Sequence, residues 1–258
     1  MTDLYIESIG NGNGQDLVFL HGWAMHSGIW QEVSASLGQH ARVHLIDLPG
    51  HGESAIDQSG ALQHWVDTVG KILPPHCIVV GWSLGGQIAM ELALQYPKIV
   101  QKLVLIATTP CFIKKIDWPS GAEPKLLELF WENLKKNYKV TIQRFLTLQM
   151  TGDESGIQNV QKLRKHFFER KQPDALGLEQ GLAILQTSDL RSGVTKIQQP
   201  VLLLHGENDV ITHINAAQWM RQQIEKSQLV TFPHCGHAPF LSYPEQFVAC
   251  LNEFRTNS

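Results

Sequence analysis

Short runs of apolar residues, bounded by turn-forming residues, recur along most of the chain. Several of them, such as 103–106 (Leu-Val-Leu-Ile) and 201–204 (Val-Leu-Leu-Leu), are apolar without alternation, which is typical of strands covered on both faces. Segments of helical length lie between most runs, and this alternation predicts an α/β fold with a mainly parallel sheet and helices on both faces. The predicted strands are residues 4–7, 17–20, 42–47, 77–80, 103–107, 201–205 and 229–232.

The alternation fails between residues 112 and 185, where the pattern is helical throughout. Helices are predicted at residues 124–137, 140–150, 156–171 and 175–187, with turn-forming residues between them. A structureless loop of this length would be improbable inside a compact domain. We therefore expect a core formed by residues 1–111 and 186–258, and an all-helical insertion at 112–185 that covers the C-terminal strand ends as a lid.

Composition narrows the class of protein. A chain of 258 residues with 43% apolar residues can bury a large core, and its formal net charge of -3 predicts neither nucleic-acid affinity nor an acidic tail. The first residues lack the pattern of a secretory signal, and no apolar run approaches the ~20 residues that span a bilayer. We expect a soluble, cytoplasmic protein without a membrane segment. Its four scattered cysteines predict reduced thiols.

The sequence Gly81-Trp82-Ser83-Leu84-Gly85 follows an apolar strand and precedes an amphipathic helix. This is the context of a nucleophile elbow, in which a sharp, strained turn raises a serine above the sheet at a helix N-terminus. Strand and helix approach so closely there that glycines are needed two positions before and after the serine. Ser83 is therefore the candidate nucleophile.

A serine hydroxyl needs a base, and the base needs a carboxylate that fixes its tautomer. In this fold the chain order is serine, acid, histidine, and both partners follow strand ends. Asp209, after the strand 201–205, is the candidate acid, with Glu207 as its nearest rival. We interpret Asp189 as a cap or turn residue, and Asp47, which precedes the serine, as a structural residue of a glycine-rich turn.

Twelve histidines compete for the role of the base. His237 is the candidate because it lies in the last strand-end loop, after the acid, and Gly236 gives its backbone freedom. His234 is the serious competitor. Cys235, two residues before His237, could itself be a nucleophile, but nothing else indicates a thiol enzyme and we interpret it as a small apolar filler.

Acyl transfer places negative charge on the former carbonyl oxygen, which two backbone N–H groups usually bind. The residue after the nucleophile, Leu84, is one expected donor, and Trp23, after the strand 17–20 and Gly22, is the other. The sequence contains no metal-binding spacing and no nucleotide-binding loop, so we expect neither a metal nor a cofactor.

Several motifs, taken together, resemble those of a known family. They are His21-Gly22-Trp23, residues 45–54, residues 81–86, Pro110-Cys111-Phe112, residues 144–149 (Arg-Phe-Leu-Thr-Leu-Gln), Ser188-Asp189-Leu190-Arg191 and His237-Ala238-Pro239-Phe240. Nearly end to end, the chain resembles the pimeloyl-[acyl-carrier protein] methyl ester esterases, α/β hydrolases of biotin synthesis. The resemblance implies hydrolysis of the methyl ester of a pimeloyl chain held on acyl-carrier protein.

The resemblance also implies an acyl-binding set. This set is Trp23, Leu84, Phe145, Leu146, Thr147, Leu148, Gln149 and His237. The apolar members of the segment 145–149 are also explained if they only pack the helices of the lid.

Charge is distributed unevenly along the chain. Basic residues dominate between 135 and 171, on an otherwise acidic protein, and such a patch would steer an acidic acyl-carrier protein. The candidate docking residues are Lys139, Arg144, Lys162, Arg164 and Lys165. A solvated helix face explains any single lysine equally well. Where the family resemblance implies further arginines, this sequence has Val140, Ile157 and Gln161.

Two other functions use the same features. A broad-specificity carboxylesterase, or a hydrolase of carbon–carbon bonds, would use the same triad on a free small molecule. A non-catalytic binding protein with the hydrolase fold would need no triad. We expect a monomeric serine carboxylesterase.

Overall fold

The computed structural model describes residues 3–10 and 14–257 of the chain. In this part, seven strands form one sheet in the order β1-β3-β2-β4-β5-β6-β7, with β1 antiparallel to β3 and all other pairs parallel. The strands are β1 (Ile6–Ile9), β2 (Asp16–Leu20), β3 (Arg42–Ile46), β4 (Cys77–Trp82), β5 (Val100–Ile106), β6 (Val201–Gly206) and β7 (Ser227–Phe232). The predicted mainly parallel sheet is confirmed.

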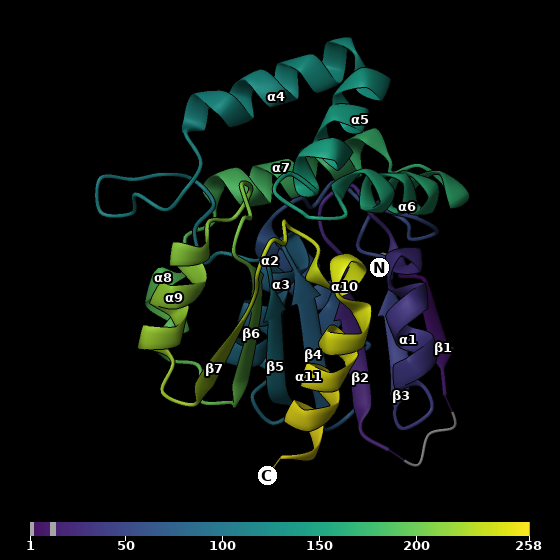
Figure 1. The fold of residues 1–258 in the computed structure, drawn as a ribbon, viewed down its shortest axis with the longest axis vertical. Coiled ribbons are helices and arrows are strands. Elements are labelled where there is room, and N and C mark those ends of the chain that lie inside the picture. The colour runs from purple at the N-terminus through teal and green to yellow at the C-terminus, as the bar shows by residue number, and fades with distance from the viewer. Residues whose placement is uncertain (1–2, 11–13, 258) are drawn as a thin grey trace.

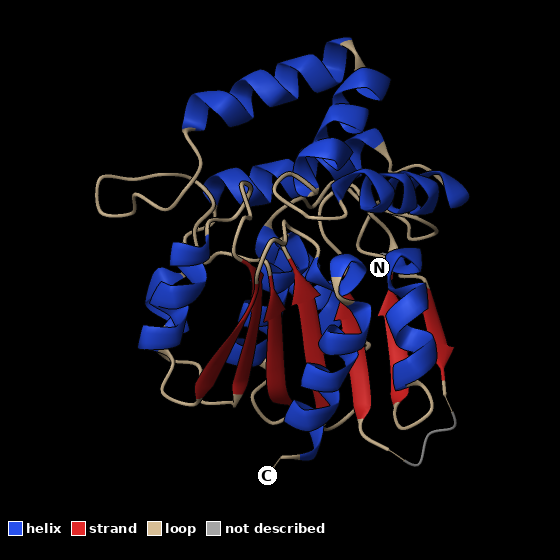
Figure 2. Cartoon of the chain, viewed as in Figure 1, coloured by secondary structure: helices blue, strands red, loops and turns tan. Residues whose placement is uncertain are grey.

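Helices cover both faces of the sheet (Figures 1 and 2). On one face α1 (Gln31–Leu37) packs against α11 (Pro244–Thr256), and on the other α3 (Leu84–Gln95) packs against α2 (Leu62–Gly70) and α8 (Arg191–Val194). β4 and β6 are consequently buried along their whole length, which explains why their sequences are apolar without alternation. Outside the segment between β5 and β6, the other elements are η1 (Ser27–Trp30), α9 (Ile214–Gln223) and α10 (Pro239–Ser242).

The boundaries of several strands differ from the predicted ones. β1 begins at Ile6 instead of residue 4, because its register with β3 pairs Ile6 with Ile46 and Ile9 with Val43. β5 begins at Val100, earlier than predicted, because its first residues pair with the start of β4 although Gln101 and Lys102 interrupt the apolar run. Backbone pairing with the neighbouring strand determines where β1 and β5 begin, and the pattern of apolar side chains alone does not reveal that pairing.

Four helices lie between β5 and β6 in the chain and above the C-terminal ends of the parallel strands (Figure 1). They are α4 (Pro124–Lys136), α5 (Tyr138–Gln149), α6 (Gly156–Glu169) and α7 (Ala175–Thr187). Each lies within two residues of a predicted helix at both ends. The β-structure within residues 112–185 consists of isolated bridges, such as that of Ile113 with Ala122, and no strand of the sheet lies there.

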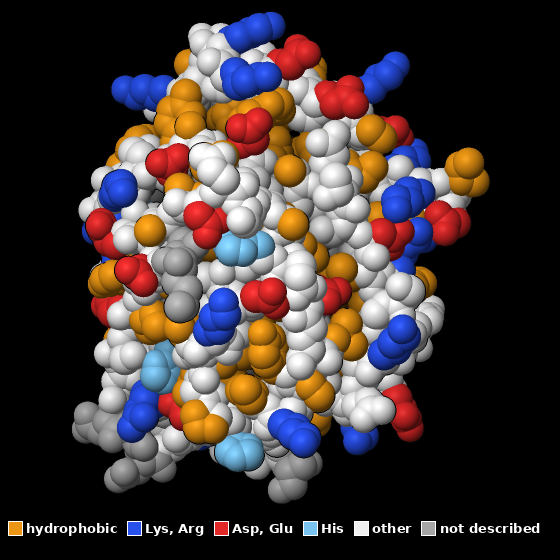
Figure 3. Space-filling model, turned by 180° about the vertical axis from the view of Figure 1, so that it is seen from behind, with side chains coloured by type: hydrophobic (Ala, Val, Ile, Leu, Met, Phe, Trp, Pro, Cys, Tyr) orange, Lys and Arg blue, Asp and Glu red, His pale blue; other side chains and the backbone are white. Residues whose placement is uncertain are grey.

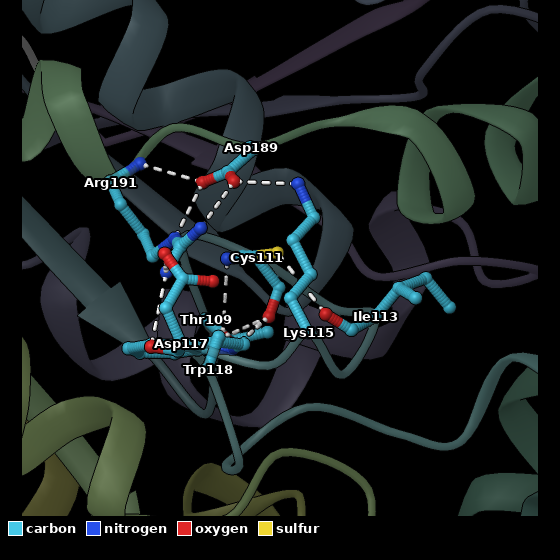
Figure 4. A network of polar contacts seen from close by, with 8 residues as sticks. All are labelled: Thr109, Cys111, Ile113, Lys115, Asp117, Trp118, Asp189 and Arg191. Carbon is cyan, nitrogen blue, oxygen red and sulfur yellow. Dashed lines mark hydrogen bonds and ion pairs between the residues drawn. The ribbon is translucent and has the colours of Figure 1, made fainter.

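The connections of this helical segment to the core are held by polar contacts. Where the segment begins and ends, Arg191 binds Asp189 and Asp117, Lys115 binds Asp189, and the Arg191 guanidinium lies over the Trp118 ring (Figure 4). These contacts fix the two connections side by side. In the described part of the chain, no helix has the length and apolar composition needed to cross a bilayer.

Candidate active site

Ser83 occupies a strained turn between β4 and α3. Its φ of 55° and ψ of -116° lie outside the usual regions for a residue with a side chain. A Cβ at Gly81 would lie 2.4 Å from the Gly85 carbonyl oxygen, and one at Gly85 would lie 2.5 Å from the Leu20 carbonyl oxygen. Only glycines allow this close approach of strand, turn and helix, and the turn presents Ser83 to a cavity above the sheet.

Asp209 follows β6 and is buried. Its Oδ1 accepts the backbone N–H groups of Ile211 and Thr212, and its Oδ2 accepts the Thr212 hydroxyl at 2.7 Å. Burial alone would raise the pKa of this carboxyl, but His237 and these hydrogen bonds outweigh burial and lower it. Asp209 is therefore a carboxylate that can only accept hydrogen bonds.

His237 lies in the loop after β7 and is buried beside Asp209. Its Nδ1 is 2.8 Å from Asp209 Oδ2, so Nδ1 carries the proton and donates a hydrogen bond to the carboxylate. The lone pair of Nε2 is thereby left available in the neutral ring. The His237 backbone is fixed on both sides, because its N–H donates to the Gln149 carbonyl at 2.8 Å and its carbonyl accepts the Trp82 indole N–H at 2.8 Å.

The hydrogen bond from the Trp82 indole N–H to the His237 carbonyl connects the histidine with the nucleophile elbow. Trp82 immediately precedes Ser83, and its ring centroid is 5.6 Å from that of His237. Residues 83, 209 and 237 thus each follow a strand at the C-terminal edge of the sheet, with His237 bound to Asp209 and in contact with Trp82 of the elbow.

The rival residues lie elsewhere. Glu207 is exposed and accepts the Thr231 hydroxyl at 2.8 Å, and His234 is exposed at a positive φ of 50°. Cys235 is fully buried, and burial raises the pKa of its thiol to about 12, so it stays protonated and unreactive.

The two aspartates interpreted as structural have local partners. Asp47 accepts the backbone N–H groups of Ser27 and Glu53, and thereby shapes the turn after β3. Asp189 accepts the Arg191 backbone N–H and pairs with its guanidinium, outside the site.

Two backbone N–H groups lie beside the elbow. Leu84 is the first residue of α3, so its N–H has no partner within the helix. In the described ranges, no hydrogen bond uses the N–H of Trp23 either. A Cβ at Gly22 would lie 3.3 Å from the Ser83 Cβ, so the Trp23 loop is in direct contact with the elbow.

A cavity of about 310 Å³ opens above Ser83. Its lining is Trp23, Ser83, Phe112, Ala122, Leu126, Leu127, Phe130, Phe145, Leu148, Leu182, Leu185, Val210 and Ile211. Apart from Ser83 every lining residue is apolar. Leu126, Leu148 and Val210 are 62%, 46% and 55% exposed, so the cavity opens to solvent between α4, α5 and the loop after β6.

The predicted acyl-binding residues divide into two groups. Trp23, Phe145 and Leu148 line the cavity, and the Trp23 and Phe145 rings pack edge to face at 5.1 Å. The others do not line it, for separate reasons. Leu84 and Leu146 are wholly buried in the core, Gln149 supports His237 through its backbone carbonyl, and His237 itself is buried against Asp209.

Thr147 faces away from the cavity. Its hydroxyl donates to the Gln143 carbonyl and accepts from the Arg164 guanidinium at 3.1 Å. Sequence reasoning missed the cavity residues of α4, α7 and the loops after β5 and β6. Their apolar positions were visible, but nothing in the pattern showed which helix face would meet the site.

The candidate docking residues are likewise dispersed. Arg144 and Arg164 line a surface groove of about 410 Å³ that also includes Leu148, on the rim of the cavity. Lys162 pairs with Glu32 of the core at 3.3 Å, Lys165 pairs with Glu169 at 3.5 Å, and Lys139 is exposed. Seen from behind, the top of the molecule carries charges of both signs beside apolar side chains (Figure 3).

The fold and the grouping of a strained serine, a histidine and a buried carboxylate define the class of α/β hydrolases. Residues 17–244 match the family model described as alpha/beta hydrolase fold. Among solved structures, the chain is similar to an esterase from Exiguobacterium antarcticum, with a TM-score of 0.92, 24% identity, and coverage of 99% of this chain and 96% of that one. At this identity the likeness shows the fold.

Sequence relatives are more specific. The chain is 52% identical to the pimeloyl-[acyl-carrier protein] methyl ester esterase of Nitrosomonas europaea, over 98% of this chain and 99% of that protein. It is 48% identical to the protein of the same name from Nitrosospira multiformis, over 98% of both. The chain therefore belongs to the pimeloyl-[acyl-carrier protein] methyl ester esterase family, and the resemblance found in its motifs is confirmed.

Proposed function

We propose that this protein is a serine carboxylesterase that hydrolyses the methyl ester of pimeloyl-[acyl-carrier protein] and releases methanol in biotin biosynthesis. The observation that carries this proposal is the ionised Asp209 bound to His237 Nδ1, beside an elbow serine that opens into an apolar cavity. The names of the family members supply the substrate.

In the proposed mechanism, Ser83 is the nucleophile. His237 Nε2 takes its proton as the oxygen attacks the ester carbonyl, and Asp209 stabilises the imidazolium. The Trp23 and Leu84 N–H groups bind the oxyanion. The proton on His237 then passes to the leaving methoxide, and methanol departs from the acyl-enzyme. Water, deprotonated by His237, attacks the acyl-enzyme in turn, and collapse of the second oxyanion frees the acid and restores Ser83.

The helical segment 112–185 is proposed as a lid. It supplies most of the cavity wall, including Phe145 and Leu148 of α5, and its lining suits the methylenes of an acyl chain. Because the reacting ester lies at Ser83 and the opening at Leu126, Leu148 and Val210, the chain would extend towards the surface, where a carrier protein can hold its other end.

The proposed partner is an acidic acyl-carrier protein. Arg144 and Arg164, in the groove that adjoins the cavity rim, are the proposed contacts, and the exposed Lys139 precedes Val140 of the same groove. Lys162 and Lys165 contribute less, because each is paired with a glutamate. We propose a monomeric, cytoplasmic enzyme that needs no cofactor and binds neither nucleic acid nor membrane.

The decisive test is rescue of a biotin-requiring bacterial strain that lacks its own methyl ester esterase. Growth with the wild type but not with Ser83→Ala is expected. Purified protein should also hydrolyse the carrier-bound methyl ester faster than free methyl pimelate. Equal rates without rescue would indicate a broad carboxylesterase, and failure of Ser83 to react with a fluorophosphonate would indicate a binding protein.

A further inference from the structure

The peptide group between Gly22 and Trp23 has its carbonyl bound by His21 and its N–H beside the nucleophile elbow. We propose that His21 is a positioning residue that aims the Trp23 N–H at the reacting carbonyl by binding the Gly22 carbonyl of the same peptide. This inference rests on the proposed function only in taking the Trp23 N–H as an oxyanion donor.

The protonation state of His21 follows from its two partners. Its Nε2 lies 2.9 Å from the Leu48 backbone nitrogen, and because a backbone N–H can only donate, Nε2 must accept. In a neutral ring the proton is then on Nδ1, which donates to the Gly22 carbonyl at 2.8 Å. The ring is fully buried, and burial together with the neighbouring His51 lowers the pKa of His21 to about 3, so it is neutral in the working range of the enzyme.

Peptide geometry transmits this bond to the other side of the loop. The carbonyl and the N–H of a trans peptide point in opposite directions. Gly22 O also accepts the Met25 N–H at 3.2 Å, so two donors hold the carbonyl end away from the site. The opposite end carries the Trp23 N–H, and Gly22 itself lies against Ser83, since a Cβ added to this glycine would be 3.3 Å from Ser83 Cβ.

A second histidine holds the next peptide. His51 Nε2 accepts the N–H of Ala24 at 3.3 Å, and Ala24 has a positive φ of 65°. The His21 and His51 rings lie 5.2 Å apart.

The two hydrogen bonds to the Gly22 carbonyl have a second effect. They polarise the peptide group, and this polarisation makes the Trp23 N–H of the same peptide a stronger donor.

Two variants separate aiming of the peptide from simple support of the loop. Asparagine places an N–H where Nδ1 lies, so His21→Asn keeps the donor to Gly22 O and loses the acceptor for Leu48. Glutamine places an oxygen where Nε2 lies, so His21→Gln keeps the Leu48 bond and loses the donor. His21→Ala loses both.

The experiment measures kcat and KM on a short p-nitrophenyl ester, affinity for a trifluoromethyl ketone, and thermal unfolding. We expect His21→Gln to lower kcat about tenfold or more with KM little changed, because only stabilisation of the transition state is affected. The affinity for the trifluoromethyl ketone should fall by a similar factor. His21→Asn should keep kcat near the wild-type value even where its melting temperature is lower.

Equal kcat values for the two variants, or kcat values that follow melting temperature, would overturn the proposal. Should His21→Gln fail to fold, His21→Asn must exceed His21→Ala in kcat by a similar factor. The generic ester keeps this test separate from the proposed function: a wild type that hydrolyses it but ignores the carrier-bound ester would refute the substrate and leave the role of His21 testable.

Discussion

Asp209 Oδ2 lies 2.8 Å from His237 Nδ1, although the two residues belong to loops that follow different strands. The neighbouring strands β6 and β7 are parallel and in register from Val201 and Ser227 onwards, so their following loops emerge side by side. The pair is therefore a direct consequence of sheet topology. The hydrogen bonds from Ile211 and Thr212 then fix the carboxylate within its loop.

The first prediction concerns this pair. Asp209→Asn should lower kcat about 10⁴-fold with little loss of structure, because an amide N–H facing Nδ1 would select the wrong histidine tautomer. Glu207→Gln is the matched control and should keep full activity, since Glu207 is exposed and bound to Thr231. Steady-state kinetics on a p-nitrophenyl ester measure kcat for both variants. Comparable losses of kcat in the two would refute the assignment of Asp209 as the acid.

A second grouping of the same residue types tests whether the elbow matters. At the sheet edge, Ser8 Oγ lies 2.9 Å from His44 Nδ1, and His44 Nε2 lies 2.7 Å from Asp16 Oδ1. Ser8 is exposed on β1, away from any strained turn. We expect Ser83→Ala and His237→Ala to lose nearly all turnover and fluorophosphonate labelling, while Ser8→Ala and His44→Ala retain both. Loss of labelling in the Ser8 variant would contradict this.

The third prediction concerns the cavity rim. Leu148→Glu places a charge where an acyl chain should enter, and desolvating that charge opposes binding, so KM for a hexanoate ester should rise about tenfold or more. Leu129→Glu is the control, because Leu129 is 55% exposed on the neighbouring α4 but does not line the cavity. Leu148→Glu should raise KM for acetate esters less than KM for hexanoate esters. Equal KM values for the two variants would place the acyl chain elsewhere.

Much of this site could be predicted from local pattern. Apolar runs located the strands, and the elbow glycines made Ser83 the candidate nucleophile, because crowding at that turn leaves a local signature. The chain order and strand ends then selected Asp209 and His237. Each of these inferences depends on residues near one another in sequence or on the rule of parallel strands.

The cavity could not be predicted in the same way. Phe130, Leu182 and Ile211 come from three distant segments, and which face of α4 or α7 meets the site depends on tertiary packing. Residues 145–149 illustrate the difficulty, since α5 turns Phe145 and Leu148 towards the cavity and Leu146 into the core. Partners such as Glu32 for Lys162 were equally invisible, because they lie far away in sequence.

The fourth prediction concerns the carrier protein. Arg144→Glu should lower kcat/KM for a carrier-bound ester several-fold or more and leave a free ester unchanged, because reversing charge beside the rim repels an acidic partner. The control Arg221→Glu makes the same change on α9 of the core. The difference should shrink as salt is raised. An equal effect on both substrates would show damage to the site instead of a docking defect.

The last prediction concerns pH and stability. His51 is fully buried, and burial lowers its pKa to about 4 from 6.5, although hydrogen bonding to the Pro49 carbonyl opposes the shift. Since the folded pKa is the lower one, the unfolded chain binds the extra proton between pH 6.5 and pH 4. The stability that this group contributes is therefore complete above pH 6.5 and is lost as pH falls towards 4.

From these two pKa values, the loss between pH 7 and pH 5 is about 2 kcal/mol, at ~1.4 kcal/mol for each unit of pKa difference. His51→Gln keeps an acceptor for the Ala24 N–H but cannot bind that proton, so its free energy of unfolding should fall less over the same interval. Urea titrations of both proteins at the two pH values measure the difference. Parallel losses would mean that His51 does not titrate in this range, and that other buried histidines, such as His205, carry the acid sensitivity.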